Sequence, residues 1–218
     1  MPFHAFGARD YLTIYLHRIR AIVLLDDWLF QVQRRLERSV LKLPETADFL
    51  FKIVFLGDGA VGKTSLVGRY VYDSFEGDYL ATIGTDIHIK MVRVGDTVVK
   101  LVIWDIAGQD NFAQLRRAYY MNASGAFFVF DTTRPETIER VDEWINALFT
   151  VTGKIPLVLL ENKVDLESSI TEGTRDYVKK QHEVQIIKTS AKEDMNVEEA
   201  FKEMTREILE KIRVKKPV

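Results

Sequence analysis

The stretch that decides the fold is Gly57-Asp58-Gly59-Ala60-Val61-Gly62-Lys63-Thr64, which directly follows the apolar run Phe51–Leu56. It fits the pattern G-x-x-x-x-G-K-[ST] in full, between a predicted strand and a predicted helix. Glycines let the backbone turn tightly, so that successive N–H groups point at phosphate oxygens. Lys63 adds a positive charge for the phosphates, and the helix that begins there adds its positive dipole end. The stretch therefore predicts nucleotide binding.

The pattern around this loop predicts the architecture, because short runs rich in Val, Ile and Phe alternate with amphipathic stretches. The predicted strands are 49–56, 87–94, 98–105, 126–131, 155–160 and 184–188, and the predicted helices are about 63–72, 110–121, 136–150, 172–181 and 195–212. Such alternation favours an α/β fold with a parallel sheet. The tight turn Gly95-Asp96 joins two strands. We therefore predict a mostly parallel six-stranded sheet with one antiparallel edge strand and helices on both faces.

The composition excludes several classes of protein. The chain has 218 residues, with 30 Lys and Arg against 32 Asp and Glu, so a net charge of −2 gives no basis for nucleic-acid binding. It has no cysteine, which excludes disulfides, thiolate zinc sites, thiol catalysis and cysteine lipidation. The apolar runs are too short for a membrane span, and no signal peptide is recognisable. The expected location is the cytoplasm.

Three later segments follow predicted strands, where a doubly wound sheet presents its ligand-binding loops. They are Trp104-Asp105-Ile106-Ala107-Gly108-Gln109, Asn162-Lys163-Val164-Asp165 and Ser190-Ala191-Lys192. Each of the last two, taken alone, is equally typical of a plain surface loop. After a complete phosphate-binding loop, the three together indicate a site that also selects the base of the nucleotide.

With these segments the chain resembles the Ras superfamily of small GTPases, most closely its Rab branch, over residues 49–212. The likeness continues in the segments Thr82-Ile83-Gly84-Thr85-Asp86, Leu115-Arg116-Arg117-Ala118-Tyr119-Tyr120 and Phe128-Val129-Phe130-Asp131-Thr132-Thr133. The resemblance implies a three-layer P-loop GTPase fold, with a G domain at 49–213 that binds GTP or GDP with Mg²⁺. A helical extension at 1–48 and a short basic tail at 214–218 would flank it.

The resemblance also implies which residues bind guanine. Asp165 would accept hydrogen bonds from the N1–H and the 2-amino group. Asn162 and the Ala191 N–H would meet the other edge of the base, and the stem of Lys163 and the ring of Phe75 would cover its faces. The whole nucleotide-binding set would be Gly59, Ala60, Val61, Gly62, Lys63, Thr64, Ser65, Phe75, Thr82, Gly108, Asn162, Lys163, Asp165, Ser190, Ala191 and Lys192.

By the same resemblance, Mg²⁺ would be held by Thr64, Thr82 and, through water, Asp105. Gln109 would orient the attacking water, while Lys63 would stabilise the charge that develops on the bridging oxygen. No arginine stands out as a catalytic finger, since the solvated state is the expectation for Arg69, Arg116, Arg117 and Arg134. Hydrolysis is therefore expected to be slow without a partner protein.

Two segments would act as switches, 75–86 and 107–120, because contacts of Thr82 and Gly108 with the γ-phosphate would order them. Effector, exchange and GTPase-activating proteins would read these segments. An exposed apolar patch for such partners is predicted at Ile83, Trp104 and Tyr119, with packing in the core as the alternative.

Some residues depart from the Rab pattern. Ala60, Ile106 and Asp110 are mild changes, whereas Glu161 replaces a small residue and is expected to bring a carboxylate near the base. The end of the chain, Arg213-Val214-Lys215-Lys216-Pro217-Val218, lacks the cysteines that Rab proteins prenylate. A membrane cycle that depends on prenylation is therefore not implied.

The first 48 residues lie outside the resemblance. Apolar residues recur there at helical spacing, at Ile19, Ile22, Leu25, Leu29, Val32, Leu36, Val40 and Leu43. One helix that ends at Pro44, or a hairpin in which Asp26-Asp27 caps a second helix, fits this stripe. Packing on the G domain or on another chain, peripheral membrane association, and disorder all remain open.

Three functions compete. A switch that hydrolyses GTP is favoured over a module that holds a guanine nucleotide without turnover, because Gln109 and Thr82 are intact. A P-loop ATPase is disfavoured by Asn162 and Asp165.

Overall fold

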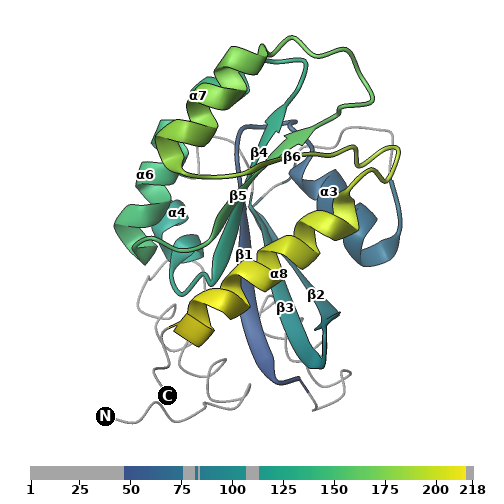
Figure 1. Ribbon diagram of the computed structural model, residues 1–218, viewed down its shortest axis with the longest axis vertical. Helices are drawn as coiled ribbons and strands as arrows, with labels where there is room; N and C mark the ends of the chain where they lie inside the picture. The colour runs from purple at the N-terminus through teal and green to yellow at the C-terminus, as the bar shows by residue number, and fades with distance from the viewer. Residues whose placement is uncertain (1–46, 76–81, 83, 107–112, 215–218) are drawn as a thin grey trace.

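The computed structural model describes residues 47–75, 82, 84–106 and 113–214, with the backbone alone for 113–116 and 214. A six-stranded sheet in the order β2-β3-β1-β4-β5-β6 runs through the described chain, between two layers of helices (Figure 1). Its strands are β1 (Phe49–Leu56), β2 (Thr85–Val94), β3 (Thr97–Ile106), β4 (Gly125–Asp131), β5 (Leu157–Asn162) and β6 (Ile186–Lys188). The helices are α3 (Lys63–Tyr72), α4 (Ala113–Tyr120), α5 (Glu136–Glu139), α6 (Val141–Thr152), α7 (Glu172–His182) and α8 (Val197–Val214).

The predicted fold class is confirmed. The edge strand β2 pairs antiparallel with β3, and the other neighbours pair parallel. Gly95 supplies the positive φ of 59° at the turn between β2 and β3. The single helix predicted at 136–150 is wrong, because Arg140 leaves the helical conformation (φ −82°, ψ 5°) and separates α5 from α6.

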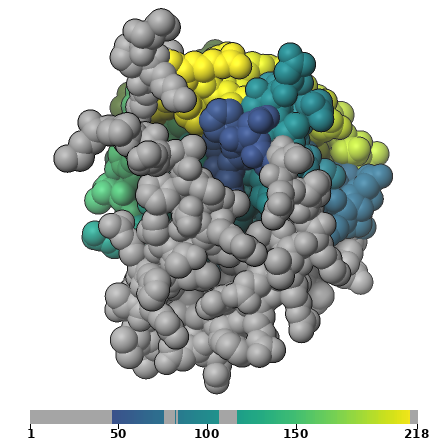
Figure 2. Space-filling view, turned by 90° about the horizontal axis from the view of Figure 1, so that it is seen from below, coloured from purple at the N-terminus to yellow at the C-terminus, as the bar shows by residue number. Residues whose placement is uncertain are grey.

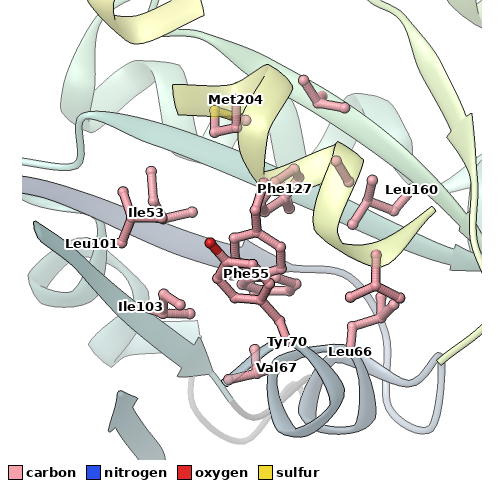
Figure 3. Close-up of a cluster of buried hydrophobic side chains, with 14 of the residues drawn as sticks. Ile53, Phe55, Leu66, Val67, Tyr70, Leu101, Ile103, Phe127, Leu160 and Met204 are labelled. Atoms are coloured by element: carbon pink, nitrogen blue, oxygen red, sulfur yellow. The ribbon is translucent and has the colours of Figure 1, made fainter. Parts of the chain in front are cut away.

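One face of the sheet packs against α3 and α8. Alternate residues of β1, such as Ile53 and Phe55, point to this face because side chains alternate along a strand. Tyr70 of α3 stacks on Phe201 of α8, with the ring centroids 3.6 Å apart. Figure 3 shows Tyr70 and Phe55 close to Phe127 of β4. This aromatic cluster fixes the helix that follows the phosphate-binding loop.

The other face packs against α4, α5, α6 and α7. Val54 and Leu56 of β1 and Phe128 and Phe130 of β4 point to this side, where the fully buried Trp144 of α6 joins them. Because both β1 and β4 are covered on both faces, they read in the sequence as continuous apolar runs. The central position of β1 brings the phosphate-binding loop to the middle of the sheet edge.

The start of β1 lies at the end of the sheet opposite the phosphate-binding loop. At the end where β1 begins, Asp48 donates its N–H to the Val98 carbonyl (2.8 Å) and accepts the Val98 N–H at Oδ2 (2.7 Å). Figure 2 shows this start of β1 between α8 and the β2–β3 turn. Apart from residues 47, 48 and 214, the predicted extension and tail lie outside the described residues. Over the ranges that the structure describes, no helix has the length and apolarity to cross a membrane.

Candidate functional site

The phosphate-binding loop joins β1 to α3 at the carboxyl end of the sheet. Gly57, with φ 122°, lies so close to β4 that a Cβ atom would stand 2.1 Å from the Val129 carbonyl oxygen. Gly62, with φ 97°, approaches β5 in the same way, because a Cβ there would stand 2.3 Å from Nδ2 of Asn162. At these two positions only glycine fits, and the loop is held tightly against its neighbours.

Lys63 is the first residue of α3, and its side chain is buried. Its ammonium group donates to the carbonyl oxygens of Gly57 and Asp58, both at 2.8 Å. The lysine thus reaches back over its own loop. A cation at this place, at the amino end of a helix, provides the positive potential that a di- or triphosphate needs.

Oxygen atoms suited to a magnesium ion meet beside Lys63. Oγ1 of Thr64 lies 2.7 Å from Oγ1 of Thr82 and donates to Oδ2 of Asp105 at 2.5 Å. Oδ1 of Asp105 is buried and has no hydrogen-bond partner in the described part of the chain. Burial raises the pKa of Asp105, although Thr64 and Lys63 oppose the rise. Two hydroxyl groups and a carboxylate fit Mg²⁺, which takes few protein ligands and completes its shell with phosphates and water.

Asn162, the last residue of β5, connects the phosphate-binding and base-binding loops. Its Nδ2 donates to the Val61 carbonyl at 2.9 Å, and its Oδ1 accepts from the Ala191 N–H at 3.3 Å. The side chain is buried. Asn162 therefore holds three of the predicted binding segments together.

The structure also describes the other predicted base-binding residues. Oδ1 of Asp165 accepts from the Ser190 hydroxyl at 2.6 Å, and Lys192 lies 4.0 Å from the other carboxylate oxygen. Nζ of Lys163 donates to the Ala60 carbonyl at 2.8 Å. Phe75, whose side chain is 38% exposed, ends the described segment that follows α3.

Sequence reasoning missed a carboxylate that supports this arrangement. Asp131, at the end of β4, is almost fully buried and lies 2.7 Å from Nζ of Lys163 and 3.2 Å from Nε of Arg134. Arg134, which was expected to be solvated, keeps 35% of its side-chain surface accessible, but it also donates to the Gly59 carbonyl at 3.0 Å and so is bound to the phosphate-binding loop. Burial tends to raise the pKa of Asp131, but hydrogen bonds from Lys163 and Thr133 outweigh it and lower the pKa. The sequence signals for Asp131 were its position at the end of an apolar strand and its place in the Rab-like segment Phe128–Thr133.

A second support holds the start of the same loop. Oδ1 of Asp58 accepts from Nη1 of Arg140 at 3.0 Å and from the Trp144 indole at 3.2 Å. Arg69 of α3 donates to the Ala191 carbonyl at 3.0 Å. Contacts from α3, α5–α6 and the loop after β6 therefore converge on the predicted nucleotide site.

The expectations for Glu161 and for the exposure of Tyr119 are wrong, and the alternatives left open for Trp104 are decided. Glu161 does not approach the base-binding side chains, because it points to the opposite face from Asn162 and pairs with Arg175 of α7. Trp104 and Tyr119 are not exposed, with 4% and 5% of their surface accessible. For Trp104, where exposure and core packing were both open, burial decides for core packing, and the ring centroid lies 3.9 Å from the ammonium group of the buried Lys52.

Several predicted residues lie outside the described residues. They are Gly108, Gln109, Asp110 and Ile83, together with the side chain of Arg116. Most of the segment 75–86 and the first part of the segment 107–120 also lie outside the described residues. The catalytic and switch assignments of these residues stay predictions.

Comparison with known proteins agrees with this geometry. The model of the Ras family matches residues 52–210. Ras-related protein Rab-13 of Bos taurus is 36% identical over 165 residues, which cover 74% of this chain and 81% of the relative. Ras-related protein Rab-10 of Diplobatis ommata is 34% identical over 176 residues, which cover 79% and 88% of the two chains. A Rab-13 of Canis lupus familiaris is 37% identical over 165 residues, with 74% and 81% covered.

Proposed function

Because the chain belongs to the Ras family of small GTPases and has Rab-like relatives, we propose that it is a molecular switch that alternates between GTP and GDP. The observation that carries the proposal is the position of Asn162, which bonds to the phosphate-binding loop at Val61 and to the base-binding loop at Ala191. One nucleotide would contact both loops, so a single buried side chain that joins them holds the two ends of its binding site together.

We assign the phosphate end of the site to Lys63 and the N–H groups of residues 59–65. Mg²⁺, held by Thr64, Thr82 and Asp105, would when bound supply further positive charge to the phosphate oxygens. In hydrolysis, water attacks the γ-phosphorus, the bond to the β–γ bridging oxygen breaks, and GDP and phosphate leave. Gln109 orients that water, and Lys63 stabilises the negative charge on the bridging oxygen.

We assign recognition of guanine to Asp165. A carboxylate can accept two hydrogen bonds side by side, and guanine offers two donors in that arrangement, which adenine lacks. The bond from Ser190 to Oδ1 of Asp165 supports this role because it fixes the orientation of the carboxylate. Lys163 and Phe75 would enclose the two faces of the base.

The segments 75–86 and 107–120 are proposed as the switches that effector, exchange and GTPase-activating proteins read. Thr82 supports this proposal, because its hydroxyl lies 2.7 Å from that of Thr64 and so joins the first segment to the metal-binding corner. Loss of the γ-phosphate would remove contacts that hold Thr82 there. Unaided turnover is expected to be slow, on the order of 10⁻⁴ to 10⁻³ s⁻¹ as in Ras, which is the standard example of this reaction.

The decisive experiment is to denature the purified protein and identify the released nucleotide by chromatography. GTP or GDP is expected, and ATP or no nucleotide would contradict the proposal. Single-turnover hydrolysis then separates a switch from a module that only holds the nucleotide. Gln109→Leu should slow hydrolysis tenfold or more at nearly unchanged affinity, because the glutamine acts on the water and not on the bound phosphate. Equal rates would favour the module.

For residues 1–48 we propose a helical extension that packs on protein rather than lipid, in a protein of the cytoplasm. Asp26, Asp27 and Glu37 weaken the attraction of this extension to an anionic membrane. Sedimentation of the full-length protein with anionic liposomes, beside a truncation that lacks 1–47, tests this assignment. Co-sedimentation of the full-length protein alone would favour the membrane.

A further inference from the structure

Arg175 of α7 is buried, and its side chain uses its whole hydrogen-bonding capacity. Nε and Nη2 donate to the two carboxylate oxygens of Glu161, at 2.8 and 2.5 Å. Nη2 also donates to Oγ of Ser168 at 2.7 Å, and Nη1 donates to the Ile170 carbonyl at 2.8 Å and to Glu172 at 3.1 Å. A guanidinium group has five N–H donors, and these five contacts use each of them.

Glu161 is equally enclosed. Its side chain has no accessible surface, and Oε1 accepts from the Thr132 hydroxyl at 2.6 Å in addition to Arg175. Burial tends to raise the pKa of Glu161, but the bonds from Arg175 and Thr132 outweigh it and keep the pKa below its ordinary value. The pair is therefore ionised at neutral pH, although it lies in the interior.

The contacts of this pair lie at both ends of the loop that carries Asp165. Glu161 directly precedes Asn162, where the loop leaves β5, and Arg175 holds Ser168 and Ile170, where the loop returns to α7. At the outgoing end the loop has other bonds, such as that of the Asn162 amide to Val61. At the returning end the Arg175 side chain bonds to both a side chain and a backbone carbonyl, and the Ser169 N–H donates to the Thr132 carbonyl at 2.9 Å.

We propose that the Glu161–Arg175 pair is a positioning device for the base-binding loop, and that it sets how long the nucleotide stays bound and how strictly guanine is selected. The inference rests on the proposed role of Asp165. Without Arg175, Ser168 and Ile170 lose their side-chain bonds to α7, so the stretch that carries Asp165 keeps fewer bonds at its returning end, chiefly that of the Ser169 N–H to Thr132. The carboxylate then spends less time in the orientation that accepts both donors of guanine.

If the Glu161–Arg175 pair only stabilised the fold, a variant of unchanged stability would release nucleotide at the parental rate. A double substitution therefore distinguishes the structural role from the positioning role. Replacing a buried ion pair by apolar side chains of similar size often preserves or raises stability. Glu161→Leu combined with Arg175→Met should therefore keep the melting temperature of the parent. It removes the bonds to Ser168 and Ile170, however, so positioning should still be lost.

The test measures release of GDP and of IDP, which lacks the 2-amino group, each with the same fluorescent label and an excess of unlabelled nucleotide. We expect the double variant to release GDP about tenfold faster than the parent, the factor that corresponds to 1.4 kcal/mol. The ratio of the IDP release rate to the GDP release rate should shrink, because a displaced Asp165 no longer accepts a hydrogen bond from the 2-amino group of GDP. Arg175→Lys should also speed release, since lysine cannot form the two-fold contact with the carboxylate.

The matched control is Glu183→Gln, which removes the exposed pair with Lys154 (3.1 Å) and should leave both release rates unchanged. A double variant that melts like the parent and releases GDP at the parental rate would overturn the inference, and so would faster release with an unchanged IDP-to-GDP ratio. Failure of the proposed function is distinct, because the parent itself would then bind no guanine nucleotide or would not distinguish GDP from IDP.

Discussion

Gly62→Ala tests the close packing of the phosphate-binding loop most directly. The new methyl group would stand 2.3 Å from Nδ2 of Asn162, and the residue would have to keep φ at 97°, where side chains are strained. That backbone strain costs about 1–3 kcal/mol. Moving the Asn162 amide away breaks its 2.9 Å bond to the Val61 carbonyl inside the protein, which costs roughly another 1–3 kcal/mol.

The sum, about 2–6 kcal/mol, has to appear either in stability or in nucleotide affinity. If the loop leaves its native conformation to relieve the strain, nucleotide binding has to restore that conformation, and affinity falls by the same free energy. Even the lower end corresponds to a drop of roughly 30-fold in affinity. Titration with fluorescent GDP, beside thermal unfolding of the nucleotide-free protein, measures both quantities.

The control lies three residues earlier in the same loop. A Cβ atom at Gly59 would meet nothing within 4 Å, so Gly59→Ala should leave GDP affinity within about threefold of the parent. If Gly62→Ala binds GDP as tightly as Gly59→Ala and unfolds at the same temperature, the reasoning about loop packing is refuted.

Further predictions concern the base, the extension and acid stability. Asp165→Asn should weaken GTP binding by roughly 30- to 150-fold and favour XTP, because an amide cannot accept two donors; unchanged discrimination in competition titrations would remove Asp165 from the base site. Deletion of 1–47 should preserve GTP binding, since the extension joins β1 at the end opposite the loops. If the apolar stripe packs on the G domain, the deletion should also lower the melting temperature by several degrees, because buried apolar surface stabilises the fold by about 25 cal/mol per Å². An identical melt would exclude that packing. Ionised Glu161, whose pKa is lowered from 4.5, stabilises the fold above about pH 4.5 and loses this effect as the pH falls below it. Urea unfolding at about pH 6 and pH 3.5 should therefore show a smaller loss for the Glu161→Leu, Arg175→Met variant than for the parent; equal losses would contradict the ionised pair.

The sequence by itself determined the order of elements, apart from the division between α5 and α6, and the loop that binds phosphate. Alternating apolar runs and amphipathic stretches predicted the sheet, since strand and helix periods are local properties. The motif from Gly57 to Thr64 carries its chemistry in consecutive residues, so its role followed without tertiary structure. The loops after β3, β5 and β6 were also predictable, because the ends of parallel strands meet at one edge of the sheet.

Only the tertiary structure decided which side chains support those loops and which partners they bind. Glu161 and Asn162 are neighbours in the sequence, yet β5 directs one towards α7 and the other towards the phosphate-binding loop. Asp131 and Arg134 pair with each other, but their further partners, Lys163 and the Gly59 carbonyl, come from two other loops, which no local pattern relates to them. Burial of Trp104 likewise depends on which elements cover its face of the sheet. Strand register decides the direction of a side chain, and packing between distant segments decides its partner. Neither can be predicted from the residues on either side of it in the sequence.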